Sequence, residues 1–317
     1  MNIVLITPAR PHTRLGNRNT AMRWARMLRD LGHRVRVQVE WDGKPADVMI
    51  ALHARRSHDA IARFAERYPG RALVVVLTGT DLYRDIDTDA DAQHSLRVAT
   101  RLVTLHDLVD GRLRKERAKV RVVVQSADVG SRVPALSSCF EVIVSGHLRD
   151  EKDPLRAAAA LDHLPHDSRI RVTHIGRALE PALGTAATAW MARTPRYRWL
   201  GERSHAEALR LVRRARLMVI SSKMEGGANV VCEALAAGTP VIASRIPGNV
   251  GMLGKDYAGY YPCGDERRLA ALLRKAETDA AFYALLKRQC AARRRLVSPR
   301  SERAALKRVL DEVAGGR

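Results

Sequence analysis

Residues 217–244 place a strand, a small-residue loop, a helix and a second strand in immediate succession. The apolar run Leu217–Ser221 has the composition of a buried strand, and Val230–Ala237 continues as a helix that Gly238 ends. Pro240–Ala243 then begins a second apolar run. A strand, a crossover helix and another buried strand favour a parallel sheet in an α/β protein.

The same alternation of strand and helix patterns runs along most of the chain, and it predicts parallel sheets throughout. Expected strands are Ile3–Thr7, Val35–Glu40, Val48–Leu52, Leu73–Thr78, Leu102–Leu105, Val120–Val124, Phe140–Ser145, Arg171–Ile175, Tyr197–Leu200, Leu217–Ser221 and Pro240–Ala243. Expected helices include Asn19–Leu31 with Asn19 as its N-cap, Ser57–Tyr68, Ala92–Thr100, Asp107–Glu116 and His205–Ala215.

The pattern restarts after a short polar segment, 127–138, that contains Pro134 and has the composition of a linker. We therefore expect two Rossmann-like, doubly wound domains, residues 1–133 and 134–297, with a helical segment, 298–317, that returns to the first domain. Ligands of doubly wound sheets bind at the carboxyl ends of the strands. The expected ligand site is a cleft between the two domains.

Composition limits the classes of function. The 317 residues carry a net charge of +21, which indicates either an anionic partner or ordinary helices rich in Arg. Aromatic residues are only 4% of the chain and no RNA-binding signature is present, so we expect no nucleic-acid partner. No apolar run is long enough to span a membrane, no signal peptide is recognisable, and the four cysteines are scattered, which together favour a cytoplasmic protein. Peripheral contact with a membrane surface stays open.

Glu225 and Glu233 flank the loop and helix entry in the spacing Glu-x7-Glu. Glycines let backbone N–H groups approach a phosphate, and a helix N-terminus adds unpaired donors and a partial positive charge. Carboxylates on each side can bind hydroxyl groups, so the segment suggests a nucleotide-sugar site. The alternative is a turn in which a glutamate only stabilises the helix dipole.

A second basic turn follows the first strand of the second domain, with Arg149 and Lys152 three residues apart. Both side chains could bind a diphosphate and neutralise it as a leaving group. The alternative is a solvated turn whose cations pair with Asp150 and Glu151.

Three loops of the first domain follow predicted strands and are expected to line the cleft. His53 and Asp81 are candidates for proton transfer, although a histidine after a strand can also be structural. The loop after the first strand could bind an anion or could be a mobile surface loop. The candidate acceptor-binding residues are Arg10, His12, Arg14, Gly16, Asn17, Arg18, Arg55, Arg56, Thr78, Gly79 and Thr80.

Asp85, Asp87, Asp89 and Asp91 alternate as in a cation-binding loop, but the central Gly and the closing Glu of such loops are missing. A solvated acidic loop is the preferred interpretation. We expect that no metal or other cofactor is required, because basic side chains and a helix dipole can neutralise the phosphates.

Residues 225–244, with the segments 146–152 and 200–203, resemble the nucleotide-sugar motif of the family-4 glycosyltransferases of GT-B fold. The resemblance covers roughly residues 140–289. It implies a UDP-sugar donor whose diphosphate binds Arg149 and Lys152 and whose ribose binds Glu233. Glu225 is a third catalytic candidate that would hold the sugar, the loop near the base would be Gly201, Glu202 and Arg203, and the backbone from Gly226 through Gly227, Ala228, Asn229 and Val230 would hold the phosphate and sugar.

The whole chain also resembles a narrower group, the selenosugar synthases of selenoneine biosynthesis. The matching stretches are ITPARPHTRLGNRNTA, ALHARRS, LTGTDLY and EGGANVVCEALAAGTPVIAS. That resemblance implies transfer of a hexosyl group from UDP-N-acetylglucosamine or UDP-glucose to selenophosphate, bound by the first domain, with release of UDP and phosphate.

Two departures from the general family accompany this resemblance. Gly16-Asn17 stands where a Gly-Gly turn is common, and Thr78–Asp81 stands where a sugar-contacting His is common, which puts that contact in doubt. Two alternatives remain: a glycosyltransferase with an ordinary oxygen acceptor, such as a membrane lipid, and a basic nucleic-acid-binding protein with a decayed donor site.

Overall fold

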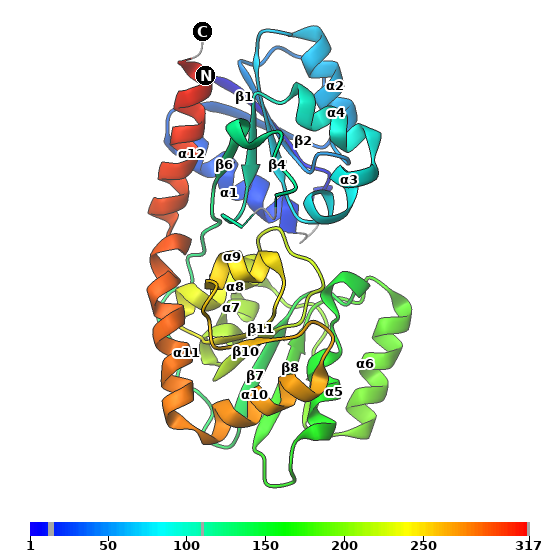
Figure 1. Cartoon of the computed structure of the whole chain (residues 1–317), viewed down its shortest axis with the longest axis vertical. Coiled ribbons are helices and arrows are strands. Elements are labelled where there is room, and N and C mark those ends of the chain that lie inside the picture. Colours follow the sequence, from blue (N-terminus) through cyan, green and yellow to red (C-terminus); the bar gives the residue numbers. More distant parts are fainter. Residues whose placement is uncertain (12–15, 109–110, 316–317) are drawn as a thin grey trace. The chain divides into compact units, whose positions relative to one another are not determined.

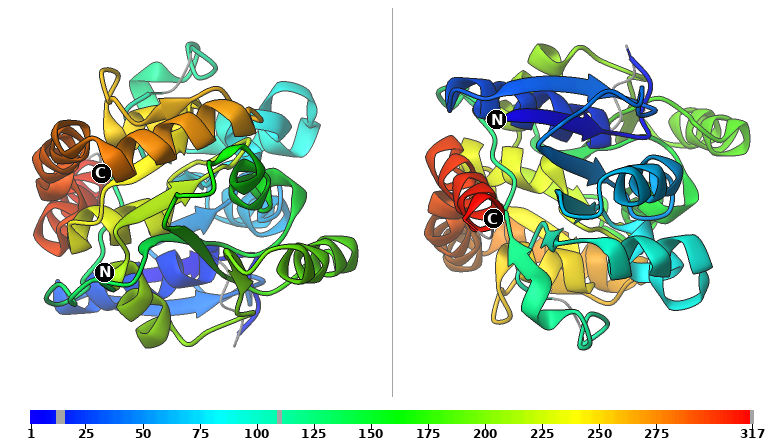
Figure 2. Two further views of the ribbon diagram at one scale, coloured as in Figure 1. Left: turned by 90° about the horizontal axis from the view of Figure 1, so that it is seen from below. Right: turned by 90° about the horizontal axis from the view of Figure 1, so that it is seen from above.

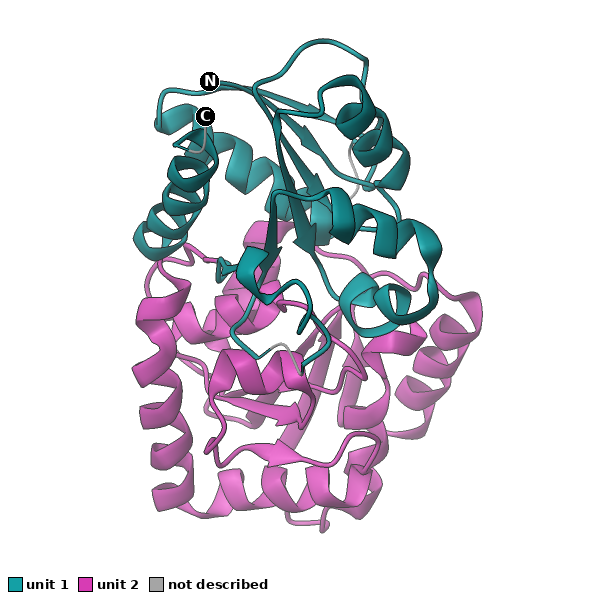
Figure 3. Ribbon diagram, turned by 45° about the horizontal axis from the view of Figure 1, so that its top comes forward, with its two compact units in different colours: residues 1–125, 299–317 teal, residues 126–298 magenta. Residues whose placement is uncertain are grey.

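The computed structural model describes residues 1–11, 16–108 and 111–315. The chain forms two compact units, which Figure 3 shows in different colours: unit 1 contains residues 1–125 and 299–317, and unit 2 contains residues 126–298. Each unit contains one six-stranded sheet in which all strand pairs are parallel. The prediction of a doubly wound α/β architecture is confirmed.

The strand order of unit 1 is β2-β1-β3-β4-β5-β6, so the direction of winding reverses between β1 and β3. Apolar side chains fill both faces of these strands, because crossover helices cover each face of a parallel sheet. The strands are β1 Asn2–Ile6, β2 Arg34–Gln38, β3 Val48–Leu52, β4 Ala72–Leu77, β5 Arg101–Thr104 and β6 Val120–Val122. The α-helices are α1 Gly16–Asp30, α2 His58–Arg67, α3 Ile86–Thr88, α4 Ala90–Val98 and α12 Pro299–Ala314.

Helix α12 joins unit 1 although it follows unit 2 in the sequence (Figure 1). Its apolar face belongs to the same core cluster as β1 and α1, and α12 contacts α1 directly. The carboxylate of Glu302 is completely buried there and accepts hydrogen bonds from the Trp24 Nε1–H at 2.7 Å and from Arg23 Nε at 2.9 Å. This helix is therefore part of the core of unit 1.

The strand order of unit 2 is β12-β11-β10-β7-β8-β9, and the winding reverses between β7 and β10. Helix α10 contacts α5, β8, β11 and β12, as the view of Figure 2 from below illustrates. The strands are β7 Phe140–Ser145, β8 Ile170–Ile175, β9 Tyr197–Trp199, β10 Leu217–Ile220, β11 Val241–Ser244 and β12 Tyr260–Tyr261. The α-helices are α5 Arg156–Ala160, α6 Pro181–Arg193, α7 His205–Arg214, α8 Asn229–Ala237, α9 Pro247–Leu253, α10 Glu266–Thr278 and α11 Ala280–Arg293.

Two local predictions are wrong. Helix α1 begins at Gly16, so Asn19 lies inside the helix and is not its N-cap. The helix expected at Asp107–Glu116 is not formed by its described residues, because 111–116 are turns and Gly111 has a φ of 68°. A left-handed residue interrupts an α-helix. Across the described residues, no helix is long and apolar enough to cross a membrane.

Candidate functional site

Unit 2 has a pocket at the carboxyl ends of β7 and β10, where the winding of its sheet reverses. Ligands of doubly wound proteins bind at this point because the adjacent loops turn to opposite sides of the sheet. The pocket is lined by Val144, Ser145, Gly146, His147, Lys152, Pro154, His174, Val219, Ile220, Ser221, Ser222, Glu225 and Val230.

The loop that precedes α8 forms one wall of this pocket. Gly226 and Gly227 lead into α8, no side chain caps the first turn, and that turn contains no acidic residue. The first N–H groups of a helix have no intrahelical acceptor, so this end of α8 can donate to an anion. Gly248, in α9, packs on this loop so closely that a Cβ there would overlap the carbonyl oxygen of Glu225. The loop thus has a fixed backbone.

Lys152 and Glu225 meet inside the pocket. The Lys152 ammonium donates a hydrogen bond to Oε1 of Glu225, and the Ser222 hydroxyl donates to the same oxygen at 2.6 Å. The side chain of Glu225 is only 8% exposed and that of Lys152 is 23% exposed. The predicted phosphate-binding lysine and the predicted sugar-binding glutamate are therefore direct partners.

Two other cations near this pocket, Arg149 and Lys223, also have carboxylate partners. Arg149 Nε lies 3.9 Å from a Glu151 oxygen, and Lys223 Nζ lies 2.5 Å from Asp150 Oδ1. Both of these pairs are more exposed than the pair of Lys152. Exposed ion pairs contribute little to stability, so Arg149 can exchange its partner for a phosphate at small cost.

His174 is a pocket residue that the sequence analysis missed. It is fully buried at the end of β8, its Nε2 lies 3.2 Å from the Gly146 carbonyl oxygen, and its Nδ1 lies 2.8 Å from the Tyr197 hydroxyl. Burial lowers the pKa of His174 to about 4, so the ring is neutral at pH 7 and donates one hydrogen bond and accepts the other. The only signal in the sequence is a histidine in an otherwise apolar strand, Ile170–Ile175.

The turn after β7 is held against the segment after β8. Besides His174, the Leu148 N–H donates to the Arg177 carbonyl at 2.9 Å, and the Arg177 N–H donates to His147 Nδ1 at 3.1 Å. Gly176 has a φ of 144°, and a Cβ there would overlap the Gly146 carbonyl. These contacts fix the start of the turn that carries Arg149 and Lys152.

The remaining donor candidates also belong to unit 2. The side chain of Glu233, in α8, is 14% exposed, and its Oε1 lies 3.9 Å from His205 Nδ1. Of the described residues that line the pocket, none belongs to the segment Gly201–Arg203, which leads into the Ser204 cap of α7. Ala228 and Asn229 form the helix entry, and Val230 lines the pocket.

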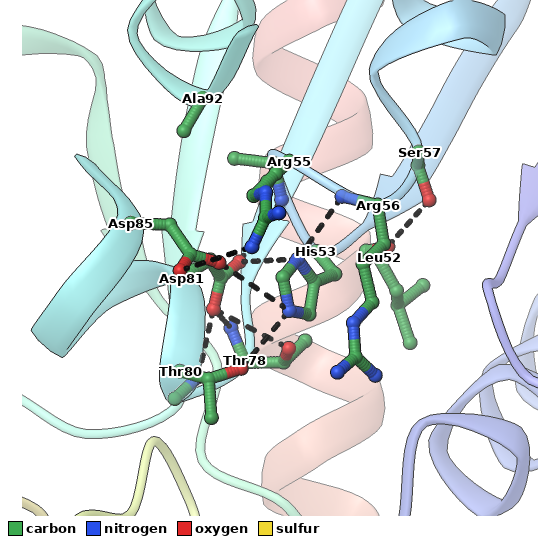
Figure 4. Close-up of polar contacts among 12 residues, drawn as sticks. Leu52, His53, Arg55, Arg56, Ser57, Thr78, Thr80, Asp81, Asp85 and Ala92 are labelled. Carbon is green, nitrogen blue, oxygen red and sulfur yellow. Dashed lines mark hydrogen bonds and ion pairs between the residues drawn. The ribbon is translucent and has the colours of Figure 1, made fainter. Parts of the chain in front are cut away.

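In unit 1, the loops after β1 and β3 also follow the point where the winding reverses. His53 directly follows β3, is 1% exposed and has a φ of 75° (Figure 4). A non-glycine residue in this left-handed region costs conformational energy, and such residues gather at functional sites.

The ring of His53 is held by two hydrogen bonds. The Arg56 backbone N–H donates to Nδ1 at 3.3 Å, so Nε2 carries the proton and donates to the Thr80 hydroxyl at 3.0 Å. Burial lowers the pKa of His53, while the nearby Asp81 carboxylate opposes this shift. The ring is therefore neutral near pH 7, but its one accepting nitrogen, Nδ1, already binds the Arg56 N–H, and its predicted role in proton transfer remains a prediction.

Asp81 is completely buried and binds backbone amides (Figure 4). Its Oδ1 accepts from the Thr78 and Gly79 N–H groups at 2.8 and 2.9 Å, and its Oδ2 accepts from the Ala54 N–H at 2.9 Å. The geometry favours Asp81 as the residue that joins the loops after β3 and β4, while its predicted role in proton transfer remains a prediction.

Arg55 and Arg56 point in different directions in Figure 4. Arg55 lies 2.9 Å from an Asp89 oxygen and 3.7 Å from Asp85, which is nearly buried. Among the described residues, no carboxylate lies within ion-pair distance of Arg56. Of these two candidates, Arg56 has the guanidinium group that an anion can bind without displacing a carboxylate.

The other acceptor candidates lie at the start of α1 and before it. Gly16, Asn17 and Arg18 form the first turn of α1, and Arg10 is exposed in the loop after β1. His12 and Arg14 lie outside the described residues.

The alternating aspartates have structural partners. Asp87 pairs with Arg112, Asp91 lies 3.5 Å from His58 Nδ1, and Asp89 caps α4 by accepting from the Ala92 N–H at 2.9 Å. Asp85 is buried, so the expectation of a solvated acidic loop is wrong at this position. Its carboxylate pairs with Arg84 at 3.1 Å.

Two doubly wound units, with a helix that follows unit 2 but packs in unit 1, define the class of GT-B glycosyltransferase folds. The structure superposes on Anabaena HepE, solved in complex with UDP and glucose, with a TM-score of 0.80 and 15% identity, covering 98% of this chain and 100% of that protein. It superposes on sucrose-phosphate synthase from Thermosynechococcus elongatus with a TM-score of 0.79 and 14% identity, covering both chains completely. At these identities the similarity shows the fold.

The family follows from the sequence of unit 2. Residues 137–294 match the family described as Glycosyl transferases group 1, and through this region the chain belongs to that family. Glycogen synthase from Mycobacterium tuberculosis is 34% identical over 175 residues. That match covers 50% of this chain and 38% of the glycogen synthase, so the chain spans well under half of that relative's length.

Proposed function

We propose that this protein transfers a hexosyl group from a UDP-sugar to an anionic acceptor. The observation that carries the proposal is the pocket at the reversal point of unit 2, which combines Lys152, Glu225 and the uncapped start of α8. A diphosphate requires cations and N–H donors, and a sugar requires hydrogen-bond acceptors for its hydroxyls. The family match and a structural relative that binds UDP and glucose support a sugar nucleotide as the ligand.

In this proposal, the bond between sugar C1 and the diphosphate oxygen breaks through an oxocarbenium-like transition state. Negative charge then develops on UDP. Arg149 and Lys152, together with the N–H groups at the start of α8, would stabilise that charge. Glu233 would bind the ribose hydroxyls, and the segment Gly201–Arg203 would lie near the base.

We further propose that the acceptor is selenophosphate and that the product is a selenosugar. This specificity rests on the resemblance of four stretches to selenosugar synthases. Two of them, ALHARRS and LTGTDLY, contain His53 and Asp81. Selenophosphate is already a soft anionic nucleophile, so it requires positioning and charge neutralisation more than deprotonation. Arg56 is suited to hold its phosphate group.

The atoms balance in two steps. Selenium attacks C1 as UDP leaves, which forms the C–Se bond, and water then cleaves the Se–P bond to release phosphate and a selenol. Neither step requires a metal in this proposal.

The test is to incubate the purified protein with UDP-N-acetylglucosamine or UDP-glucose, with and without selenophosphate, and to follow UDP release and product mass. The expected result is UDP release that depends on selenophosphate, with a seleno-hexose product. Release of UDP only with a hydroxyl acceptor would retain a glycosyltransferase and refute the selenosugar assignment. Absence of UDP binding would refute the donor site itself.

A further inference from the structure

Glu225 is paired with Lys152, the cation of this pocket that a diphosphate would require. Its Oε1 accepts from the Lys152 ammonium and from the Ser222 hydroxyl, and all three residues line the pocket. The main chain is anchored as well, because the Ser221 hydroxyl donates to the Asp153 carbonyl at 2.7 Å, next to Lys152. The pair thus joins two well-fixed loops.

A diphosphate would compete with Glu225 for the positive charge of Lys152. Two anions in a partly buried pocket repel each other, and this repulsion is screened less than at the surface. A diphosphate that draws Lys152 away leaves Glu225 with the hydrogen bond from the Ser222 hydroxyl. A buried carboxylate that loses a charged partner must find new hydrogen-bond donors or pay the cost of desolvation.

We propose that Glu225 is a specificity-determining residue. By competing for Lys152, it distinguishes a sugar-bearing nucleotide diphosphate from the same diphosphate without the sugar. The inference rests on the proposed donor site. With the sugar present, its hydroxyl groups donate to Glu225 as Lys152 turns to the phosphates. Without the sugar, no such donors arrive, and the carboxylate favours the return of Lys152. The exchange therefore weakens the binding of the product, UDP, relative to the substrate.

Removal of the negative charge of Glu225 should strengthen the binding of UDP. Glu225→Gln keeps the shape of the side chain and an acceptor for Ser222 but removes the charge that competes for Lys152. UDP should bind the variant about threefold to tenfold more tightly than the wild type, as measured by isothermal titration calorimetry. Intact UDP-glucose should gain less or lose affinity, so the ratio of the two dissociation constants should fall.

Three controls make the measurement specific. Asp150→Asn removes one negative charge from the exposed pair with Lys223 in the same turn, and it should change UDP affinity by less than about twofold. Uridine carries no phosphate and should bind both proteins equally. Lys152→Met should abolish the gain, so that Glu225→Gln has no effect on UDP affinity in that background.

The outcomes separate the two claims. If the wild type binds neither UDP nor UDP-glucose, both the proposed donor function and the specificity role of Glu225 are refuted. If the wild type binds UDP but Glu225→Gln binds it no more tightly, with unchanged thermal unfolding, only the specificity role of Glu225 is refuted. A gain of equal size in Asp150→Asn would also refute it, because the effect would then be one of net charge.

Discussion

Asp81 in unit 1 and Glu225 in unit 2 are both buried carboxylates that follow the carboxyl ends of parallel strands, yet their partners differ in kind. Asp81 binds three backbone N–H groups. Glu225 binds a lysine ammonium and a serine hydroxyl. Backbone donors cannot leave without unfolding a loop, whereas side-chain donors can rotate toward a ligand. The first carboxylate therefore builds a site, and the second can take part in binding.

The largest expected effect tests the structural side of this comparison. Asp81→Ala leaves three N–H groups, two of them buried, without an acceptor and should lower the free energy of unfolding by about 4 kcal/mol. Urea denaturation measures the loss. Glu225→Gln should change the free energy of unfolding by less than about 1 kcal/mol. Similar losses in both variants would show that the two carboxylates contribute equally to the fold.

Arg149 tests the exchangeable side. Its ion pair with Glu151 is long at 3.9 Å, so Arg149→Ala should scarcely affect stability. If Arg149 stabilises the departing UDP, the substitution removes about 2–4 kcal/mol of transition-state stabilisation. Turnover should then fall roughly 30-fold to 1,000-fold. Steady-state kinetics with saturating donor measure this, and unchanged turnover would refute the assignment.

His174 tests whether unit 2 also contains fixed polar partners. Its pKa is about 4 in the folded protein and near 6.5 when unfolded, so only the unfolded chain binds this proton between those values. The stability contributed by the neutral ring is complete above pH 6.5 and declines as the pH falls toward 4, by up to about 3 kcal/mol.

His174→Phe should remove this part of the pH dependence. Unfolding measured from pH 4 to 7 should give a flatter profile for the variant than for the wild type. Because the His174 ring also holds the Gly146 carbonyl, UDP affinity should fall by about threefold to tenfold at pH 7. Parallel stability profiles would contradict the neutral, hydrogen-bonded state of the ring.

The smallest expected effect compares two adjacent arginines. Arg56→Ala should raise the KM for the proposed anionic acceptor about fivefold, the effect of about 1 kcal/mol of lost charge pairing. Arg55 is paired with Asp89 and Asp85, so Arg55→Ala should change this KM less. Acceptor titrations of both variants provide the measurement, and a larger effect at Arg55 would reverse the roles.

Much of the fold could be predicted from the sequence because buried parallel strands are continuous apolar runs. The strands Val48–Leu52 and Phe140–Ser145 have the predicted bounds. The helix expected at Asp107–Glu116 failed because local propensity does not reveal that Gly111 adopts a left-handed conformation. Strand patterns are repeated over several residues, whereas one turn residue can cancel a helix.

The site could be predicted in part. The loop and helix around Glu225 are contiguous in the sequence, so a phosphate- and sugar-binding segment could be predicted from the sequence alone. The partnership of Glu225 with Lys152 joins residues 73 positions apart, and the contact of His174 with Gly146 joins β8 to the residue that follows the adjacent strand β7. Such pairings depend on the register of β7, β8 and β10, which a single sequence does not specify.

The burial of Glu302 against Trp24 has a consequence for the order in which the protein folds during synthesis. Unit 2 is continuous in the chain, but unit 1 is completed by α12, which the ribosome makes after all of unit 2. While unit 2 emerges, the first 125 residues lack the apolar side chains of α12 and the acceptor for the Trp24 indole. The core of the first unit is therefore completed only when a helix encoded more than 170 residues downstream has been synthesised.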